Sequence, residues 1–183
     1  MNRKKKKIWG LWMAIFFTLM IPYALSYAES KSESRTLHVH VKIEPIFLVD
    51  VTPRYGGDTV EFGTIKRAEG EKVKTEPVQV DISVLSNLGV PYQVSQTATQ
   101  VLTSEEGTKL PLENLNVRAS EAVHGVGKIQ TPEPVTPKEQ LLFESSPKGE
   151  SDQFTADYSL QIPPTQLGGN YRTDIVYTIA TKD

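Results

Sequence analysis

The chain has 183 residues, with 20 basic and 22 acidic side chains, a formal net charge of −2 and no cysteine. The lack of cysteine excludes disulfides, thiol chemistry and cysteine-ligated metal. Five of the basic residues lie at positions 3–7, so the rest of the chain keeps 15 basic against 22 acidic residues. A net charge of about −7 without a basic cluster excludes nucleic acid as a partner.

Residues 1–28 have the pattern of a cleavable secretory signal peptide, in which a basic run at 3–7 precedes an almost wholly apolar stretch at 8–25. Small residues follow, and we expect cleavage between Ala28 and Glu29. The alternative is an uncleaved anchor, since a helix of about 20 apolar residues can also span a bilayer. After cleavage we expect a secreted, extracellular or cell-surface protein without a membrane span, which passes through the periplasm if the cell has one.

Residues 29–35 are polar and low in complexity, which predicts a disordered tail. Residues 36–183 are expected to form a single domain. At its start, segment 36–43 alternates polar and aliphatic residues and predicts a strand with one apolar face, made by Leu37, Val39, Val41 and Ile43. Burying four such side chains would contribute about 6–12 kcal/mol, against about 5–15 kcal/mol for the net stability of a domain. Segment 36–43 is therefore either a first strand within its own domain or a donor strand that completes a neighbour.

Further strands are predicted where short apolar or alternating runs lie between turn residues, at 46–51, 59–62, 78–85, 92–97, 115–118, 141–144, 154–162 and 171–179. The last two are the longest, and a connection containing Pro-Pro and Gly-Gly predicts that they form an antiparallel unit. The proline-rich stretch 125–149 is predicted to be a long surface loop.

No segment after residue 28 has apolar residues at helical spacing over three turns, so the fold is predicted to be all-β, an immunoglobulin-like antiparallel β-sandwich. The expected core residues are Leu37, Val39, Val41, Ile43, Phe62, Val80, Ile82, Val84, Tyr92, Val94, Phe154, Tyr158, Leu160, Tyr171, Ile175, Tyr177 and Ile179.

The sequence contains few groups typical of catalysis or metal binding. His38 and His40 lie two apart on one face of the first predicted strand, but without a third ligand they favour a wet outer face over a metal site. No nucleophile elbow or phosphate-binding glycine loop is present. We therefore expect no metal, no cofactor, no catalytic residue and no enzymatic activity. A hydrolase on a sandwich scaffold would need an acidic or metal-dependent pair, which the sequence does not indicate.

Two short motifs resemble the pilins of the CS1/CFA type. They are Leu37-His-Val-His-Val-Lys-Ile-Glu-Pro45 and Gly169-Asn-Tyr-Arg-Thr-Asp-Ile-Val-Tyr-Thr-Ile179. The resemblance implies assembly by a periplasmic chaperone and usher, in which the N-terminal segment of one subunit completes the open sandwich of the next.

A second resemblance is to WxL surface domains, carried by Glu61-Phe-Gly-Thr64, Val90-Pro-Tyr-Gln-Val94, Leu160-Gln-Ile-Pro163 and Ile175-Val-Tyr-Thr-Ile179. Tyr92 and Tyr177 stand where that family has tryptophan. The Phe-Gly and Gly-x-Tyr motifs are also similar to those of the spore coat U group. On this resemblance the two tyrosines could be surface binding aromatics, whereas half-buried strand tyrosines are more often core residues.

Two functions are therefore predicted. The first is an exported surface or adhesion protein, a pilin-like subunit that assembles with other copies of itself or another surface protein by strand complementation. The alternative is a monomeric WxL-like module that binds the cell wall or a protein receptor.

Overall fold

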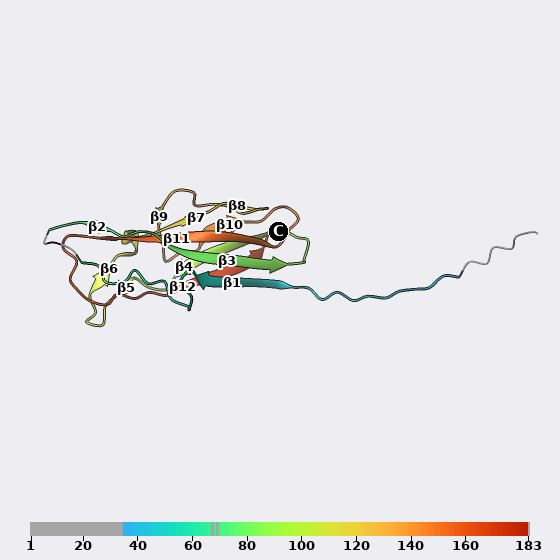
Figure 1. Cartoon of the computed structure of the whole chain (residues 1–183), viewed down its shortest axis with the longest axis horizontal. Coiled ribbons are helices and arrows are strands. Elements are labelled where there is room, and N and C mark those ends of the chain that lie inside the picture. Colours follow the sequence, from blue (N-terminus) through green and yellow to red (C-terminus); the bar gives the residue numbers. More distant parts are fainter. Residues whose placement is uncertain (1–34, 67, 69, 183) are drawn as a thin grey trace, which may run out of the picture. The chain divides into compact units, whose positions relative to one another are not determined.

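A computed structural model describes residues 35–66, 68 and 70–182 (Figure 1). The predicted signal peptide 1–28, its cleavage site between Ala28 and Glu29, and all of the predicted tail except Arg35 lie outside the described residues. The described residues from Lys42 onward form one compact unit, and residues 35–41 do not belong to it. The compact unit thus begins at Lys42, later than the expected start at residue 36.

The compact unit consists of two antiparallel sheets, which confirms the predicted all-β sandwich. The first sheet has the strand order β1 (Phe47–Pro53), β3 (Val78–Ser86), β11 (Asp152–Ile162), β7 (Leu115–Ala119) and β9 (Glu133–Pro134), with β2 (Val73–Lys74) also paired to β11. The second has the order β12 (Ile175–Thr181), β4 (Tyr92–Ala98), β10 (Gln140–Glu144) and β8 (Val126–Gly127). A small hairpin, β5 (Leu102–Thr103) and β6 (Lys109–Leu110), and the 3-10 turn η1 (Leu112–Asn114) join β4 to β7.

The pairing follows the immunoglobulin plan, in which strands A, B, E and D form one sheet and strands C, F and G form the other. The run β1-β3-β11-β7 corresponds to A-B-E-D, and β12-β4 corresponds to F-C. Within the described residues, no strand occupies the position of G at the outer side of β12. In the part of the chain that the structure describes, this edge of the sandwich is therefore uncovered.

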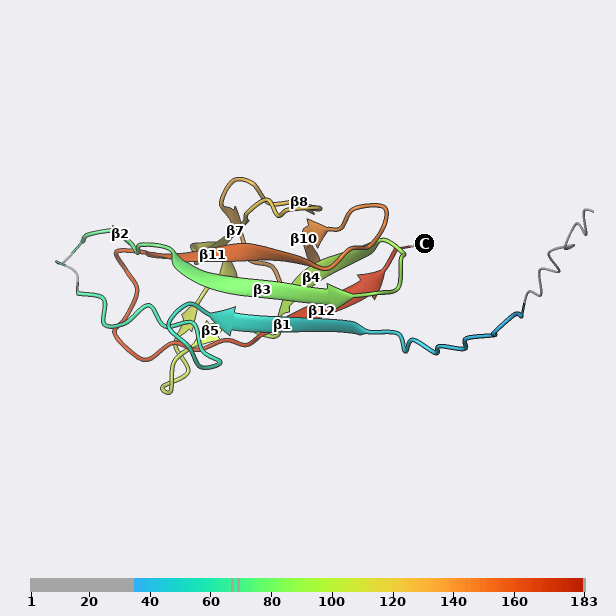
Figure 2. The same cartoon turned by 45° about the vertical axis from the view of Figure 1, so that its right-hand side comes forward.

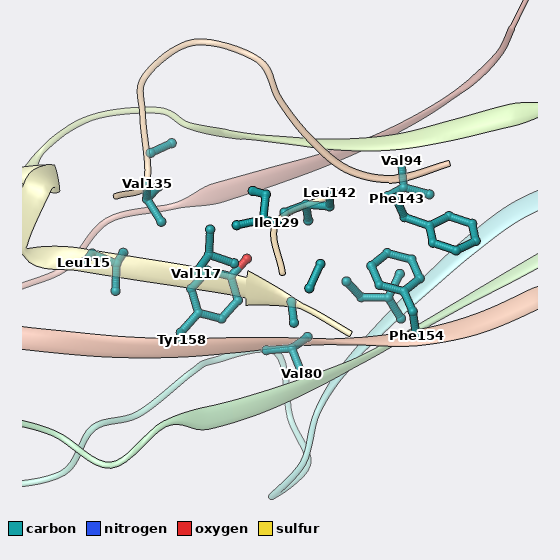
Figure 3. Close-up of a cluster of buried hydrophobic side chains, with 14 of the residues drawn as sticks. Val80, Val94, Leu115, Val117, Ile129, Val135, Leu142, Phe143, Phe154 and Tyr158 are labelled. Carbon is teal, nitrogen blue, oxygen red and sulfur yellow. The ribbon is translucent and has the colours of Figure 1, made fainter. Parts of the chain in front are cut away.

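The core lies between the sheets, where the alternation of each strand buries one face. Phe143 of β10 stacks on Phe154 of β11 with ring centroids 4.6 Å apart, at the right-hand end of the cluster in Figure 3. The residues predicted for the core that are buried are Val80, Ile82, Val84, Tyr92, Val94, Phe154, Tyr158 and Leu160. Those that pack on it while half-buried are Phe62, Tyr171, Ile175, Tyr177 and Ile179. The four predicted core residues of segment 36–43 are exposed.

The interpretation of 125–149 as a surface loop is wrong. This stretch contains β8, β9 and β10, and it buries Ile129 and Val135. Its prolines are compatible with strand structure because Pro134 lies in the exposed edge strand β9, where a missing N–H costs no ladder bond. Ile129 and Val135 lie in the core cluster with Val117 of β7 and Leu142 of β10 (Figure 3).

Two other strand predictions were wrong. Residues 59–62 form no strand, although Val60 and Phe62 pack on the core. Strands β11 and β12 do not pair, because β11 belongs to the first sheet and β12 to the second. The connection 163–174 is longer than the two to five residues typical of a hairpin and instead crosses from one sheet to the other.

Candidate functional site

The first part of the candidate site is the N-terminal apolar segment, residues 36–43. These residues form neither helix nor strand. The side chains that the alternation predicted to be buried are almost fully exposed, with exposed fractions of 86% for Leu37, 77% for Val39, 75% for Val41 and 78% for Ile43. Four aliphatic side chains at a spacing of two residues are an unusual surface feature, since soluble domains seldom leave a regular apolar stripe in water.

The second part is the open edge of the sandwich, formed by the neighbouring outer strands β1 and β12. Each of these strands is paired on one side only, with β3 and β4 respectively. In both views β12 lies beside β1 (Figure 1 and Figure 2). The inward side chains of the central strand β4 are mostly buried, whereas those of β1 and β12 are only half-buried. The half-buried residues of β1 and β12 are Phe47, Val49, Val51, Ile175, Tyr177 and Ile179.

The open edge presents two kinds of binding group. The outer side of β12 carries backbone N–H and C=O groups without a strand partner, which form a template for one more strand. The half-buried apolar side chains of β1 and β12, which pack against the core, lie beneath it, and we call them the apolar lining. An extended segment with apolar residues at every second position matches both, because its backbone extends the sheet and one face of its side chains extends the core.

A buried hydrogen-bond chain fixes Tyr177 within the open edge. The Tyr158 hydroxyl donates to Gln96 Oε1 and lies 2.6 Å from the Tyr177 hydroxyl. Gln96 in turn donates from Nε2 to Gln140 Oε1 at 3.0 Å. Burial raises the pKa of Tyr177 to about 12 and holds the pKa of Tyr158 well above its ordinary value. Both hydroxyls therefore stay neutral, and the ring of Tyr177 stays on the inner face of β12.

The structure places Tyr92 in the core and not on the surface. Its ring is fully buried beside Phe47 and Phe143, and its hydroxyl donates to the Glu150 carbonyl at 2.9 Å. Burial and the nearby Asp152 carboxylate raise the pKa of Tyr92 to about 12. Tyr92 is thus unavailable as a surface binding aromatic, whereas Tyr177 lies at the open edge.

The other chemistry-bearing groups are dispersed or serve the fold. His38 and His40 are exposed in the segment 36–43, and no cluster of three or more metal-ligating side chains occurs within residues 35–66, 68 and 70–182. The buried Asp152 carboxylate accepts backbone hydrogen bonds from Val123, His124 and Gly125 at 2.7–3.1 Å, so it holds the loop before β8. No helix among the described residues is long and apolar enough to cross a membrane.

Sequence reasoning found the apolar segment but missed the other half of the site. The run 46–51 was predicted to be a strand, yet nothing in its pattern shows that β1 lies at an edge beside β12. Edge position depends on pairings between residues far apart in the sequence, such as Phe47 with Ser86 and Ile175 with Ala98. Within each strand, the only sign of its edge position is that half-buried and exposed side chains alternate, with few fully buried ones.

Comparisons with known proteins add little to this geometry. No family model and no curated protein matches the chain. Among solved structures, the chain is similar to a family 123 glycoside hydrolase from Clostridium perfringens, with a TM-score of 0.38 and 14% identity over 61% of this chain. The match spans 19% of the length of that hydrolase, whose structure was analysed for glycolipid glycan hydrolysis.

The prediction that the protein is not an enzyme is corrected by this comparison, because the matched structure belongs to a glycoside hydrolase. A likeness of this size carries no argument for the activity of the present chain.

Proposed function

We propose that the protein is an exported surface structural subunit that assembles with other copies of itself by strand complementation. The N-terminal apolar segment of one copy adds to the open edge of the next, beside β12. The observation that carries the proposal is the coincidence of an exposed apolar stripe at 36–43 with a sandwich edge that lacks its covering strand.

The dimensions of the two parts support this pairing. Residues 36–43, extended at about 3.3 Å per residue, reach about 26 Å. The seven residues of β12 span about 23 Å at the same rise. A donated segment therefore covers the whole free edge, and its four aliphatic side chains lie over the apolar lining between β1 and β12.

The energetic argument also favours complementation. Transfer of four aliphatic side chains from water into an apolar groove contributes about 6–12 kcal/mol. The same step shields Ile175, Tyr177 and Ile179, which are half-buried in the single chain. New ladder hydrogen bonds pair backbone groups on β12 that face solvent. An unfilled edge of this kind invites aggregation during export, so a periplasmic chaperone that covers it, and an usher that exchanges chaperone for subunit, are the partners we propose.

A mixing experiment with two defective proteins tests the proposal. Protein 44–183 lacks the segment but keeps the edge. Ile179→Lys in protein 29–183 keeps the segment but places a charge in the apolar lining. Thr178→Lys, on the exposed face of the same strand, is the matched control.

We expect each defective protein to stay monomeric by itself and the mixture to form a one-to-one heterodimer, because only the combination supplies a free segment and an intact edge. Thr178→Lys should oligomerise as the unmodified protein does. Size-exclusion chromatography with light scattering distinguishes these states. An unmodified 29–183 protein that stays monomeric, together with no heterodimer in the mixture, would contradict the proposal and favour the monomeric binding module.

A further inference from the structure

Asn87 holds the backbone that leads from the N-terminal apolar segment into β1. Its side-chain Oδ1 accepts the Ile46 N–H at 2.7 Å, and its Nδ2 donates to the Glu44 carbonyl at 2.9 Å. Its backbone N–H donates to the Ile46 carbonyl at 3.2 Å. Residues 44–46 are therefore tied to one asparagine by three hydrogen bonds, although they lie outside any strand.

These bonds continue the β1–β3 ladder past its end. The last pair of that ladder is Phe47 with Ser86, and Asn87 is the next residue after Ser86. Beyond Asn87 the chain turns, with Gly89 in the left-handed region at φ 69°. The side-chain amide of Asn87 supplies the donor and the acceptor that the backbone of β3 can no longer offer there. We name this arrangement the Asn87 clamp.

The clamp restricts which edge the segment can reach. The open edge of the same molecule lies in the second sheet beside β1, and packed sheets are about 10 Å apart. Three extended residues also span about 10 Å, so residues 44–46 would be long enough to carry the segment back to its own edge if they were free. With the clamp formed, the first residue free to turn is Ile43. Ile43 is itself one of the four apolar side chains, so a segment that turned there could not place all four of them over the apolar lining of its own molecule.

We propose that Asn87 is a positioning residue that prevents the segment from filling its own open edge, and so directs it to a second copy of the chain. The inference rests on the proposed function. It adds a reason why the segment binds the open edge of a second molecule and not the open edge of its own, which the segment and the edge alone do not determine.

Two substitutions in protein 29–183 test the role of the clamp. Asn87→Ala removes both side-chain hydrogen bonds. Asn87→Asp keeps an acceptor for the Ile46 N–H but loses the donor to the Glu44 carbonyl. The matched control is Asn114→Ala, which removes another asparagine side chain, half-buried, that donates to a backbone carbonyl, that of Pro111 at 3.2 Å.

We expect Asn87→Ala to raise the ratio of monomer to oligomer by ~5-fold or more, the population change expected for the loss of hydrogen bonds of ordinary net strength. Asn87→Asp should give a smaller increase, and Asn114→Ala none. The monomer of Asn87→Ala should also resist trypsin at Lys42, because a self-inserted segment is protected, whereas the unmodified monomer should be cleaved there quickly. A merely structural role would lower the melting temperature without protecting Lys42.

The possible outcomes separate the inference from the function on which it rests. Oligomers of the unmodified protein, with an unchanged ratio and unchanged cleavage at Lys42 in Asn87→Ala, would overturn the role of the clamp alone. Absence of oligomers from the unmodified protein would overturn both the proposed function and this inference.

Discussion

Replacing Val39 by threonine tests whether one face of the segment enters an apolar groove. Val39 is 77% exposed in the single chain, so Val39→Thr should change the stability of the monomer by no more than about 0.5 kcal/mol. In a complemented edge the added hydroxyl would be buried without a designed partner, at a cost of about 1–3 kcal/mol. That cost corresponds to an association constant lowered by about 5- to 150-fold per junction.

The matched control is His40→Thr, which changes the neighbouring residue on the opposite face of the extended segment. We expect His40→Thr to leave association almost unchanged, because its side chain would face solvent in the complemented edge. Sedimentation equilibrium over a dilution series measures both association constants, and chemical denaturation checks the monomers. Equal effects of the two substitutions, or no effect of either, would refute the idea that the alternation of segment 36–43 selects the buried face.

Three further predictions concern the stability of the domain. Gly149→Ala should destabilise it by roughly 2 kcal/mol or more, because Gly149 has φ +59° and an added Cβ would lie 1.7 Å from the Val90 carbonyl oxygen. The control Gly57→Ala also has a positive φ, +77°, but no atom lies within 4 Å of an added Cβ, so it should cost only about 1 kcal/mol; urea denaturation measures both. Stability should fall as pH rises from about 10 to about 12, because unfolding releases protons that the fold retains on Tyr177, Tyr92 and Tyr158. Denaturant midpoints against pH should show a shallower limb for Tyr177→Phe, which removes one of these three groups. Hydrogen bonds from two lysines lower the pKa of Glu144 to about 2, so the stability that its carboxylate contributes should be lost as pH falls from about 4.5 to about 2. Glu144→Gln should lower the free energy of unfolding by less than about 1 kcal/mol at neutral pH, since the group is partly exposed. In the same titration, its denaturant midpoint should depend less on pH between about 4.5 and about 2.

The central strands could be predicted from the sequence because their alternation is long and regular. Strands β3, β4 and β11 lie where the patterns at 78–85, 92–97 and 154–162 placed them, within two residues at either end. The two-residue strands β8 and β9 were missed because they carry no period of their own and form only by pairing with β10 and β7.

The candidate site was only half predictable, for a physical reason. Alternation in segment 36–43 indicates that one face is made for burial, but it does not indicate which molecule supplies the partner surface. Ile43, the one of the four side chains that lies in the compact unit, is exposed there. The open edge, and the role of Asn87 beside it, depend on contacts between residues about 40 positions or more apart, which local patterns do not encode.

The most direct measurement of strand complementation is analytical ultracentrifugation of protein 29–183 beside protein 44–183, with a synthetic peptide of residues 36–43 added to the shorter one. We expect linear oligomers from the longer protein. The shorter protein should be an unstable monomer that the peptide stabilises with one-to-one stoichiometry, because the open edge then receives its missing strand. A compact, stable monomer from 29–183, with no binding of the peptide to 44–183, would contradict the account.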